Sequence, residues 1–256
     1  EVGEPATLGP LEFCELQLSG SPIVVVWQLP FAGVVSFDLA QNRIEEHIRK
    51  SLADAIRSMP EQTHFNFQWA GGVNKAKPLS AFETPQTATN ETKKKVLDWL
   101  HQKAPRADKF DESLPVGAVI ERLANELDDK AVVIVIVLDD DIQIPQSTID
   151  FVHRGKSIPR FHVVARKKKT SLAKIVAASK GAGVSLKAEG GLFGTDKVVV
   201  EKWDVTDVET QPKPKTSTVE PFEPRRLSID DFQLTERVAD TEVRNHLESK
   251  IREHLG

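Results

Sequence analysis

The sequence contains a single cysteine, Cys14, among its 256 residues. One thiol excludes an intramolecular disulfide and any metal site built from several cysteines. Long hydrophobic runs are also missing, because the longest has about eight residues whereas roughly 20 are needed to cross a bilayer. No secretory pattern opens the chain, but its first residue is Glu rather than Met, so the chain is compatible with being part of a longer one.

An excess of one charge is missing as well. The chain has 34 basic and 38 acidic side chains, a formal net charge of -4 and a pI of about 6.0. This balance gives no global reason to expect DNA or an anionic membrane as a partner, so nucleic acid is not expected unless it binds locally. A hydrophobic content of 39% with 28% charged residues is typical of a folded globular protein.

The most informative features present are two apolar runs without alternation, residues 23–29 and 132–138. Such runs predict parallel strands that are buried on both faces. In an open parallel sheet, ligands bind beyond the carboxyl ends of the strands. The residues that follow each run are therefore the first place to look for a site.

Amphipathic segments alternate with segments typical of strands. The spacing of apolar residues predicts helices over residues 39–59, 90–100, 116–127, 147–155 and 170–179. Further strands are predicted over 160–165 and over 63–70, where Phe65, Phe67 and Trp69 alternate with polar residues as in an edge or half-exposed strand. The predicted fold class is α/β, with a doubly wound, mostly parallel sheet flanked by helices in three α/β/α layers.

Residues 11–18 alternate with a period of two, which predicts one strand whose odd-numbered members face a core, with Cys14 as a small apolar filler. Five parts are expected along the chain. They are an N-terminal strand or extension (1–20), the α/β domain (21–188), an additional strand (189–209), a Pro-rich linker (210–226) and a C-terminal helical segment (227–256).

The order of these elements resembles a von Willebrand factor A domain over roughly residues 20–188. The local matches are the aromatic strand, Thr89-Asn-Glu-Thr-Lys-Lys-Lys-Val-Leu-Asp-Trp-Leu, and Pro115-Val-Gly-Ala-Val-Ile-Glu-Arg-Leu-Ala-Asn-Glu-Leu leading into Val132-Val-Ile-Val-Ile-Val-Leu-Asp-Asp-Asp. The resemblance implies a Rossmann-like topology with a ligand surface at the carboxyl edge of the sheet.

The sequence departs from the motif by which this family binds metal. The family carries Asp-x-Ser-x-Ser after the first strand, a Thr before the third helix and an Asp after the central strand, which together offer hard oxygen ligands to magnesium. This chain has Trp27-Gln-Leu-Pro-Phe-Ala-Gly at the first place, Leu114 at the second, and Asp139 or Asp140 at the third. The resemblance therefore implies a degenerate domain that has lost its metal site. Asp140 is the one residual metal candidate, and no cofactor is expected.

A non-catalytic module for protein interaction or structure follows from this interpretation, with a protein as the expected partner. Where family members hold a hydrated ion, this chain has apolar residues. Such residues either pack together and close the site or form a contact surface. The candidate partner-binding residues are Pro30, Phe31, Ala32, Gly33, Leu114, Asp139 and Asp140.

Two alternatives remain open. Arg166, Lys167, Lys168 and Lys169 lie between a strand and a helix N-terminus, where a phosphate ligand or nucleic acid could bind. The competing interpretation is a solvated turn whose charges face the loop at 139–141. In the second alternative, the domain is a scaffold whose tail, residues 210–256, mediates assembly.

Catalytic patterns are not found in the sequence. The seven histidines show no metal-ligand spacing, and no serine has the glycine pattern of a nucleophile elbow. The glycine pairs at 71–72 and 190–191 lack the spacing of a dinucleotide fingerprint or a P-loop. We therefore do not expect an enzyme.

Overall fold

The computed structural model describes residues 11–28, 39–70, 79–101, 116–140, 142–190, 197–206 and 208. All of them belong to the first of two units into which the chain divides, Glu1–Lys213. The predicted Pro-rich linker (210–226) and C-terminal helical segment (227–256) lie outside the described residues. No helix in the described part is long and apolar enough to cross a membrane.

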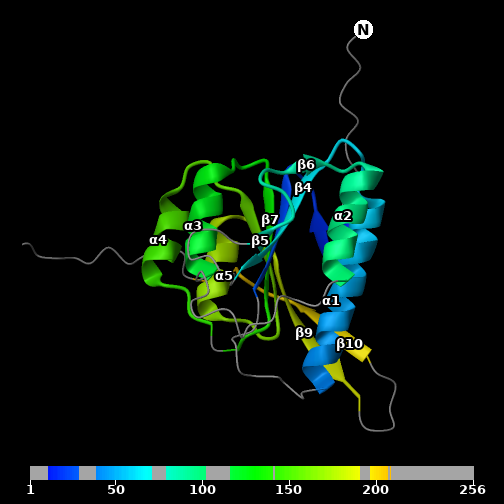
Figure 1. Cartoon of the computed structure of the whole chain (residues 1–256). Helices are drawn as coiled ribbons and strands as arrows, with labels where there is room; N and C mark the ends of the chain where they lie inside the picture. The colour runs from blue at the N-terminus through cyan, green and yellow to red at the C-terminus, as the bar shows by residue number, and fades with distance from the viewer. Residues whose placement is uncertain are drawn as a thin grey trace, which may run out of the picture. The chain divides into compact units, whose positions relative to one another are not determined.

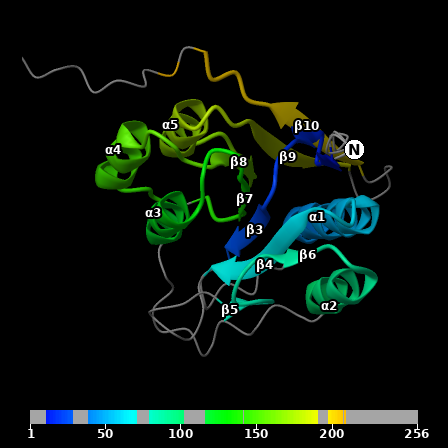
Figure 2. The same cartoon turned by 90° about the horizontal axis from the view of Figure 1, so that it is seen from above.

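A mixed sheet forms the middle layer, in the strand order β10-β9-β8-β7-β3-β4-β5, with β6 also paired to β4 (Figures 1 and 2). The central strands are parallel to one another, and the strands at both margins are antiparallel to their neighbours. The parallel strands are β3 (Ile23–Gln28), β4 (His64–Ala70), β7 (Val132–Val137), β8 (Arg160–Ala165) and β9 (Gly183–Glu189). The antiparallel strands are β5 (Leu79–Ser80), β6 (Gln86–Thr87) and β10 (Lys197–Lys202).

Helices cover both faces of this sheet, which confirms the predicted three-layer α/β/α fold class. Figure 2 shows α1 (Leu39–Ser58) and α2 (Asn90–His101) on one face. On the other face lie α3 (Val116–Glu126), α4 (Gln146–Arg154) and α5 (Thr170–Ala178). Each face has its own hydrophobic core, because successive residues of a strand point to opposite sides of a sheet.

The two apolar runs form the buried centre of the sheet, as predicted. In β3, Val25 and Trp27 face α1, whereas Val24 and Val26 face the side of α3. All six residues of β7 are buried. Burying each such side chain contributes roughly 1.5–3 kcal/mol, which favours apolar residues at every position of a strand that is covered on both faces.

The prediction that residues 63–70 form an edge or half-exposed strand is wrong. Strand β4 pairs with β3 on one side and with β5 and β6 on the other, and its polar residues Asn66 and Gln68 are buried. Both find partners: Asn66 Nδ2 donates to the Phe82 carbonyl over 3.0 Å, and Gln68 Oε1 accepts from Arg122 Nη2 over 2.7 Å. Hydrogen bonding removes most of the cost of burying an amide, so polar alternation did not mean exposure here.

Residues 11–18 form a hairpin instead of the single predicted strand. Strands β1 (Leu11–Phe13) and β2 (Leu16–Leu18) are antiparallel, and Cys14 and Glu15 form the turn with φ angles of 46° and 61°. Two successive positive φ angles are the mark of a type I′ turn, which usually carries Asn and Gly. The buried residues are odd-numbered before the turn and even-numbered after it, because Phe13 and Leu16 both face the core on the α1 side of the sheet.

Candidate functional site

The carboxyl ends of β3, β7 and β8 meet at one edge of the sheet because these strands are parallel and in register. Gln28 ends β3, Asp139 and Asp140 follow β7, and the basic run begins at Arg166 directly after β8. We call Asp139, Asp140 and residues 166–169 the carboxyl-edge surface. The structure thus brings together two candidate groups that the sequence places more than twenty positions apart.

Asp140 is the point where these two groups touch. Lys167 Nζ lies 3.0 Å from Asp140 Oδ2, and Lys169 Nζ donates a hydrogen bond to the Asp140 carbonyl. The Asp140 side chain is 30% exposed and the Lys167 side chain 68% exposed. One aspartate therefore holds two lysines of the basic run, through its carboxylate and through its backbone.

The remaining basic side chains point to other neighbours. Arg166 Nη1 lies 3.5 Å from Gln41 Oε1 of α1. Lys168 Nζ donates to the Asp204 carbonyl, in the segment that follows β10. Two hydrogen bonds from Thr206 and the charge of Lys168 lower the pKa of the Asp204 carboxyl. The four cations of the run thus contact three separate segments and do not converge on one anion position.

Metal ligands are not assembled in the described part of the chain. Within these residues no group of three or more His, Cys, Asp or Glu side chains is placed to hold a metal ion. The residual candidate Asp140 has an ammonium group against its carboxylate. Magnesium needs several oxygen ligands in near-octahedral order, and a single carboxylate that already has a cationic partner supplies few of them.

The other candidate partner-binding residues cannot be placed. Residues 30–33, with Phe31 among them, and Leu114 lie outside the described residues, as does Asp141. Of that predicted set, the structure locates Asp139 and Asp140 only.

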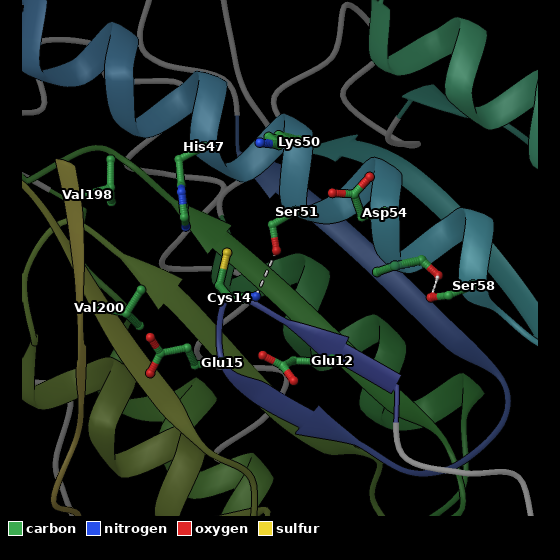
Figure 3. Close-up of a pocket in the computed structure, with 11 residues that line it drawn as sticks. Glu12, Cys14, Glu15, His47, Lys50, Ser51, Asp54, Ser58, Val198 and Val200 are labelled. Carbon is green, nitrogen blue, oxygen red and sulfur yellow. Dashed lines mark hydrogen bonds between the residues drawn. The ribbon is translucent and has the colours of Figure 1, made fainter. Parts of the chain in front are cut away.

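A cleft lies on the α1 side of the sheet, and the sequence patterns did not predict it. It is an open cleft of about 530 Å³ between the β1–β2 hairpin, α1 and β10 (Figure 3). Its lining residues, which define what we call the α1 cleft, are Glu12, Cys14, Glu15, His47, Lys50, Ser51, Asp54, Ala55, Ser58, Val198 and Val200. No local pattern could have indicated it, because three segments distant in sequence form its walls.

Cys14 lies in the wall of this cleft but is not an activated thiol. Its backbone N–H donates to Ser51 Oγ over 2.9 Å, which ties the hairpin turn to α1. Burial raises the pKa of the Cys14 thiol to about 12. Nucleophilic cysteines need a lowered pKa, so this environment does not favour covalent chemistry.

His47 lies on the same wall, and burial together with the charge of Lys50 lowers its pKa. A neutral imidazole beside a protonated thiol could accept a hydrogen bond, but no hydrogen bond joins His47 to Cys14 among the interactions of the described residues. His47 and Cys14 therefore do not form a coupled catalytic pair among the described residues.

Comparisons with known proteins give structural similarity alone. No protein-family model and no curated protein matches the chain. Among solved structures, the chain is similar to a von Willebrand factor type A protein from Catenulispora acidiphila, with a TM-score of 0.46 and 10% identity over 66% of this chain and 39% of that one.

Two structures of proximal thread matrix protein 1 from the mussel byssus are also similar. For crystal form 2 the TM-score is 0.42, with 11% identity over 61% of this chain and 41% of that one. For the form with a zinc-occupied MIDAS motif the TM-score is 0.43, with 10% identity over 65% and 44%. The chain spans less than half the length of each of these proteins.

Proposed function

We propose that this chain is a non-catalytic module for protein interaction or structure, of a degenerate von Willebrand factor A type, that makes its contacts without a metal ion. The observation that supports this most is the ion pair between Lys167 and Asp140 at the carboxyl edge, with 3.0 Å between Nζ and Oδ2. In this pair the protein itself supplies a positive charge next to Asp140, one of the two aspartates that answer to the family's metal ligand.

Lys167 competes with a metal ion for the Asp140 carboxylate. A divalent cation at Asp140 would have to displace the Lys167 ammonium or remain beside it, and like charges at such distances repel each other. Lys169 adds a second ammonium on the carbonyl of the same residue. Most of the ion's shell would still be water, so the gain from binding would be small.

The apolar sequence that follows β3 supports a contact surface that includes Phe31. The chain has Leu29-Pro-Phe-Ala-Gly-Val-Val where a metal-binding relative has hydroxyls and a carboxylate. Exposed apolar residues next to charged ones are typical of protein contact sites. We expect a partner to bind Phe31 together with the carboxyl-edge surface.

Thermal unfolding with magnesium, manganese or calcium, each measured against a chelator, tests the proposal that no metal ion is bound. A ligand that binds only the folded state raises the unfolding temperature in proportion to saturation. We expect no shift at millimolar metal. A saturable shift that Asp140→Ala abolishes, and that Asp98→Ala on α2 leaves intact, would restore cation-dependent recognition.

A pair of surface variants tests the contact surface. Phe31→Asp should weaken binding to a partner and leave the unfolding temperature unchanged. Phe151→Asp on α4, where the native side chain is 36% exposed, is the matched control and should leave partner binding intact. If Phe31→Asp instead unfolds the chain, Phe31 belongs to the core and the proposed surface is wrong.

A further inference from the structure

The α1 cleft combines a sheet edge with a charged wall, and both are independent of the carboxyl-edge surface. We propose that it binds an extended, basic peptide segment of a partner protein, which adds to the edge of β10 as a further antiparallel or parallel strand. This site lies on the α1 side of the sheet and goes beyond the function proposed above.

The outer edge of β10 can accept a further strand. β10 is the terminal strand of the sheet and pairs with β9 over six residues, and it has no second strand neighbour in the described part of the chain. Peptide groups at such an edge can pair with an added strand. Lys197, Glu201 and Lys202 flank three consecutive valines, so the stretch from Val198 to Val200 is the apolar part of the edge.

The cleft gives that edge a side wall for the peptide's side chains. Val198 and Val200 are partly buried and both line the cleft, facing α1 (Figure 3). Residues of a strand alternate between two faces, so every second side chain of an added strand would enter the cleft beside these valines. The volume of about 530 Å³ is in the range of ligand sites rather than of packing defects.

The charge of the wall selects the partner. Glu12, Glu15 and Asp54 bring three carboxylates to the cleft. Arg57 Nη1 pairs with Asp54 Oδ1 over 2.9 Å, so Glu12 and Glu15 are left against the ammonium of Lys50 and the wall keeps a negative balance. Burial lowers the pKa of His47, which keeps its imidazole neutral near pH 7. Lysine or arginine side chains of the peptide therefore meet a negative wall, and acidic ones meet repulsion.

The hairpin turn fixes one of these carboxylates. Cys14 and Glu15 both have positive φ angles, which cost free energy in residues other than glycine and persist only where the surroundings hold them. The hydrogen bond from the Cys14 N–H to Ser51 supplies such a hold. It keeps Glu15 at the end of the hairpin that faces β10, as Figure 3 shows.

Nuclear magnetic resonance of the full chain tests the proposal directly. The probe is a capped seven-residue peptide in which Lys and Val alternate, and its counterpart has Glu in place of Lys. We expect the Lys peptide to shift the signals of Val198, Val200 and His47 in a saturable, salt-dependent way and to lower the pKa of His47 further. The Glu peptide should not bind.

Two controls separate charge from strand pairing. The double variant Glu15→Gln, Asp54→Asn should weaken binding on the order of three- to thirtyfold, because exposed charge pairs contribute little each. Glu126→Gln on the opposite face of the sheet is the matched control and should have no effect. A Lys peptide with alternate backbone nitrogens methylated should lose binding, since it keeps its charges but cannot complete the strand pairing.

Four outcomes would overturn the proposal. Equal binding of the methylated peptide would exclude strand addition, and binding that ignores Glu15 and Asp54 would place the peptide elsewhere. Shifts that leave the β10 signals unchanged would do the same. Binding only after deletion of residues 209–256 would mean that this chain's own tail occupies the cleft, and would exclude a partner peptide as its natural occupant.

Discussion

The indole ring of Trp203 lies against Gly183, so that a Cβ on Gly183 would overlap the ring. Two hydrogen bonds fix this position: the Trp203 N–H donates to the Gly183 carbonyl over 2.8 Å, and Trp203 Nε1 donates to Ser185 Oγ over 2.7 Å. The tryptophan thereby holds the segment after β10 on the α5 side of the sheet, where it joins the core.

Gly183→Ala should destabilise the protein, because the added methyl group has no room beneath the ring. We expect a loss of about 1–3 kcal/mol of unfolding free energy, as for other overpacked cores, with a change in tryptophan fluorescence. Urea denaturation measures it. Trp203→Leu in the same background should recover part of the loss, and a double-mutant cycle without coupling between the two sites would contradict this packing.

His162 predicts how stability depends on pH. The residue is buried in β8, and neither ring nitrogen meets a hydrogen-bond partner among the described residues. Burial and the charge of Arg160 lower its pKa to about 4. The unfolded chain then binds a proton near the usual pKa of about 6.5 while the folded chain does not, so stability is lost as pH falls from about 6.5 to about 4.

The loss from this one group is roughly 3 kcal/mol at most. Unfolding in urea at several pH values should show that His162→Leu is less sensitive to acid than the native chain over this interval. Exposed His64 provides the matched variant, and His64→Gln should retain the native pH dependence. If native chain and His162→Leu lose stability in parallel, the imidazole is already charged in the folded protein.

Cys14 should react slowly with thiol reagents in the folded protein. With its pKa raised to about 12 from 9.0, the thiolate fraction near pH 8 falls by about a thousandfold. Labelling with a disulfide reagent, in native buffer and in urea, measures the difference. Rapid, complete labelling of the native chain would show that the hairpin turn opens often.

Lys167→Ala should change stability little, by less than about 1 kcal/mol, because the Lys167 side chain is largely exposed and such pairs are screened. Lys94→Ala, which breaks the 2.8 Å pair with Asp98 on α2, is the comparison and should cost a similar small amount. A loss of several kcal/mol for Lys167→Ala alone would mean that the pair holds the two loops together.

Helices and central strands could be read from the sequence because their patterns are local and strong. The run at 132–138 gave β7, and the helical spacing at 39–59 gave α1 to within one residue. Apolar residues dominate these segments for a physical reason, since every side chain of a strand covered on both faces must be buried. Such patterns depend little on distant parts of the chain.

Where partners are distant in sequence, prediction failed. The polar residues of β4 read as exposed, but Phe82 and Arg122 supply their hydrogen bonds from elsewhere in the chain. The turn at Cys14 and Glu15 lacks glycine, asparagine and aspartate, so nothing marked it as a turn. Tertiary contacts stabilise that conformation, and they are visible only in the folded structure.

The site was predictable to the same limited degree. Parallel strands made it possible to expect that the loops after β7 and β8 meet, and Lys167 does contact Asp140. That Lys168 turns instead to Asp204 depends on where the segment after β10 runs, which no local pattern specifies. The α1 cleft depends in the same way on how the hairpin docks on α1.

Strand β9 extends past the strand beside it. Only Gly183, Val184 and Ser185 pair with β8, whereas the pairing with β10 continues to Glu189. Beyond Ser185, β9 and β10 thus pair only with each other, as a two-stranded ribbon. Ribbons of two strands have marginal stability by themselves. Its amides should exchange with deuterium through openings that leave the central sheet closed, so the β10 valines can move without global unfolding.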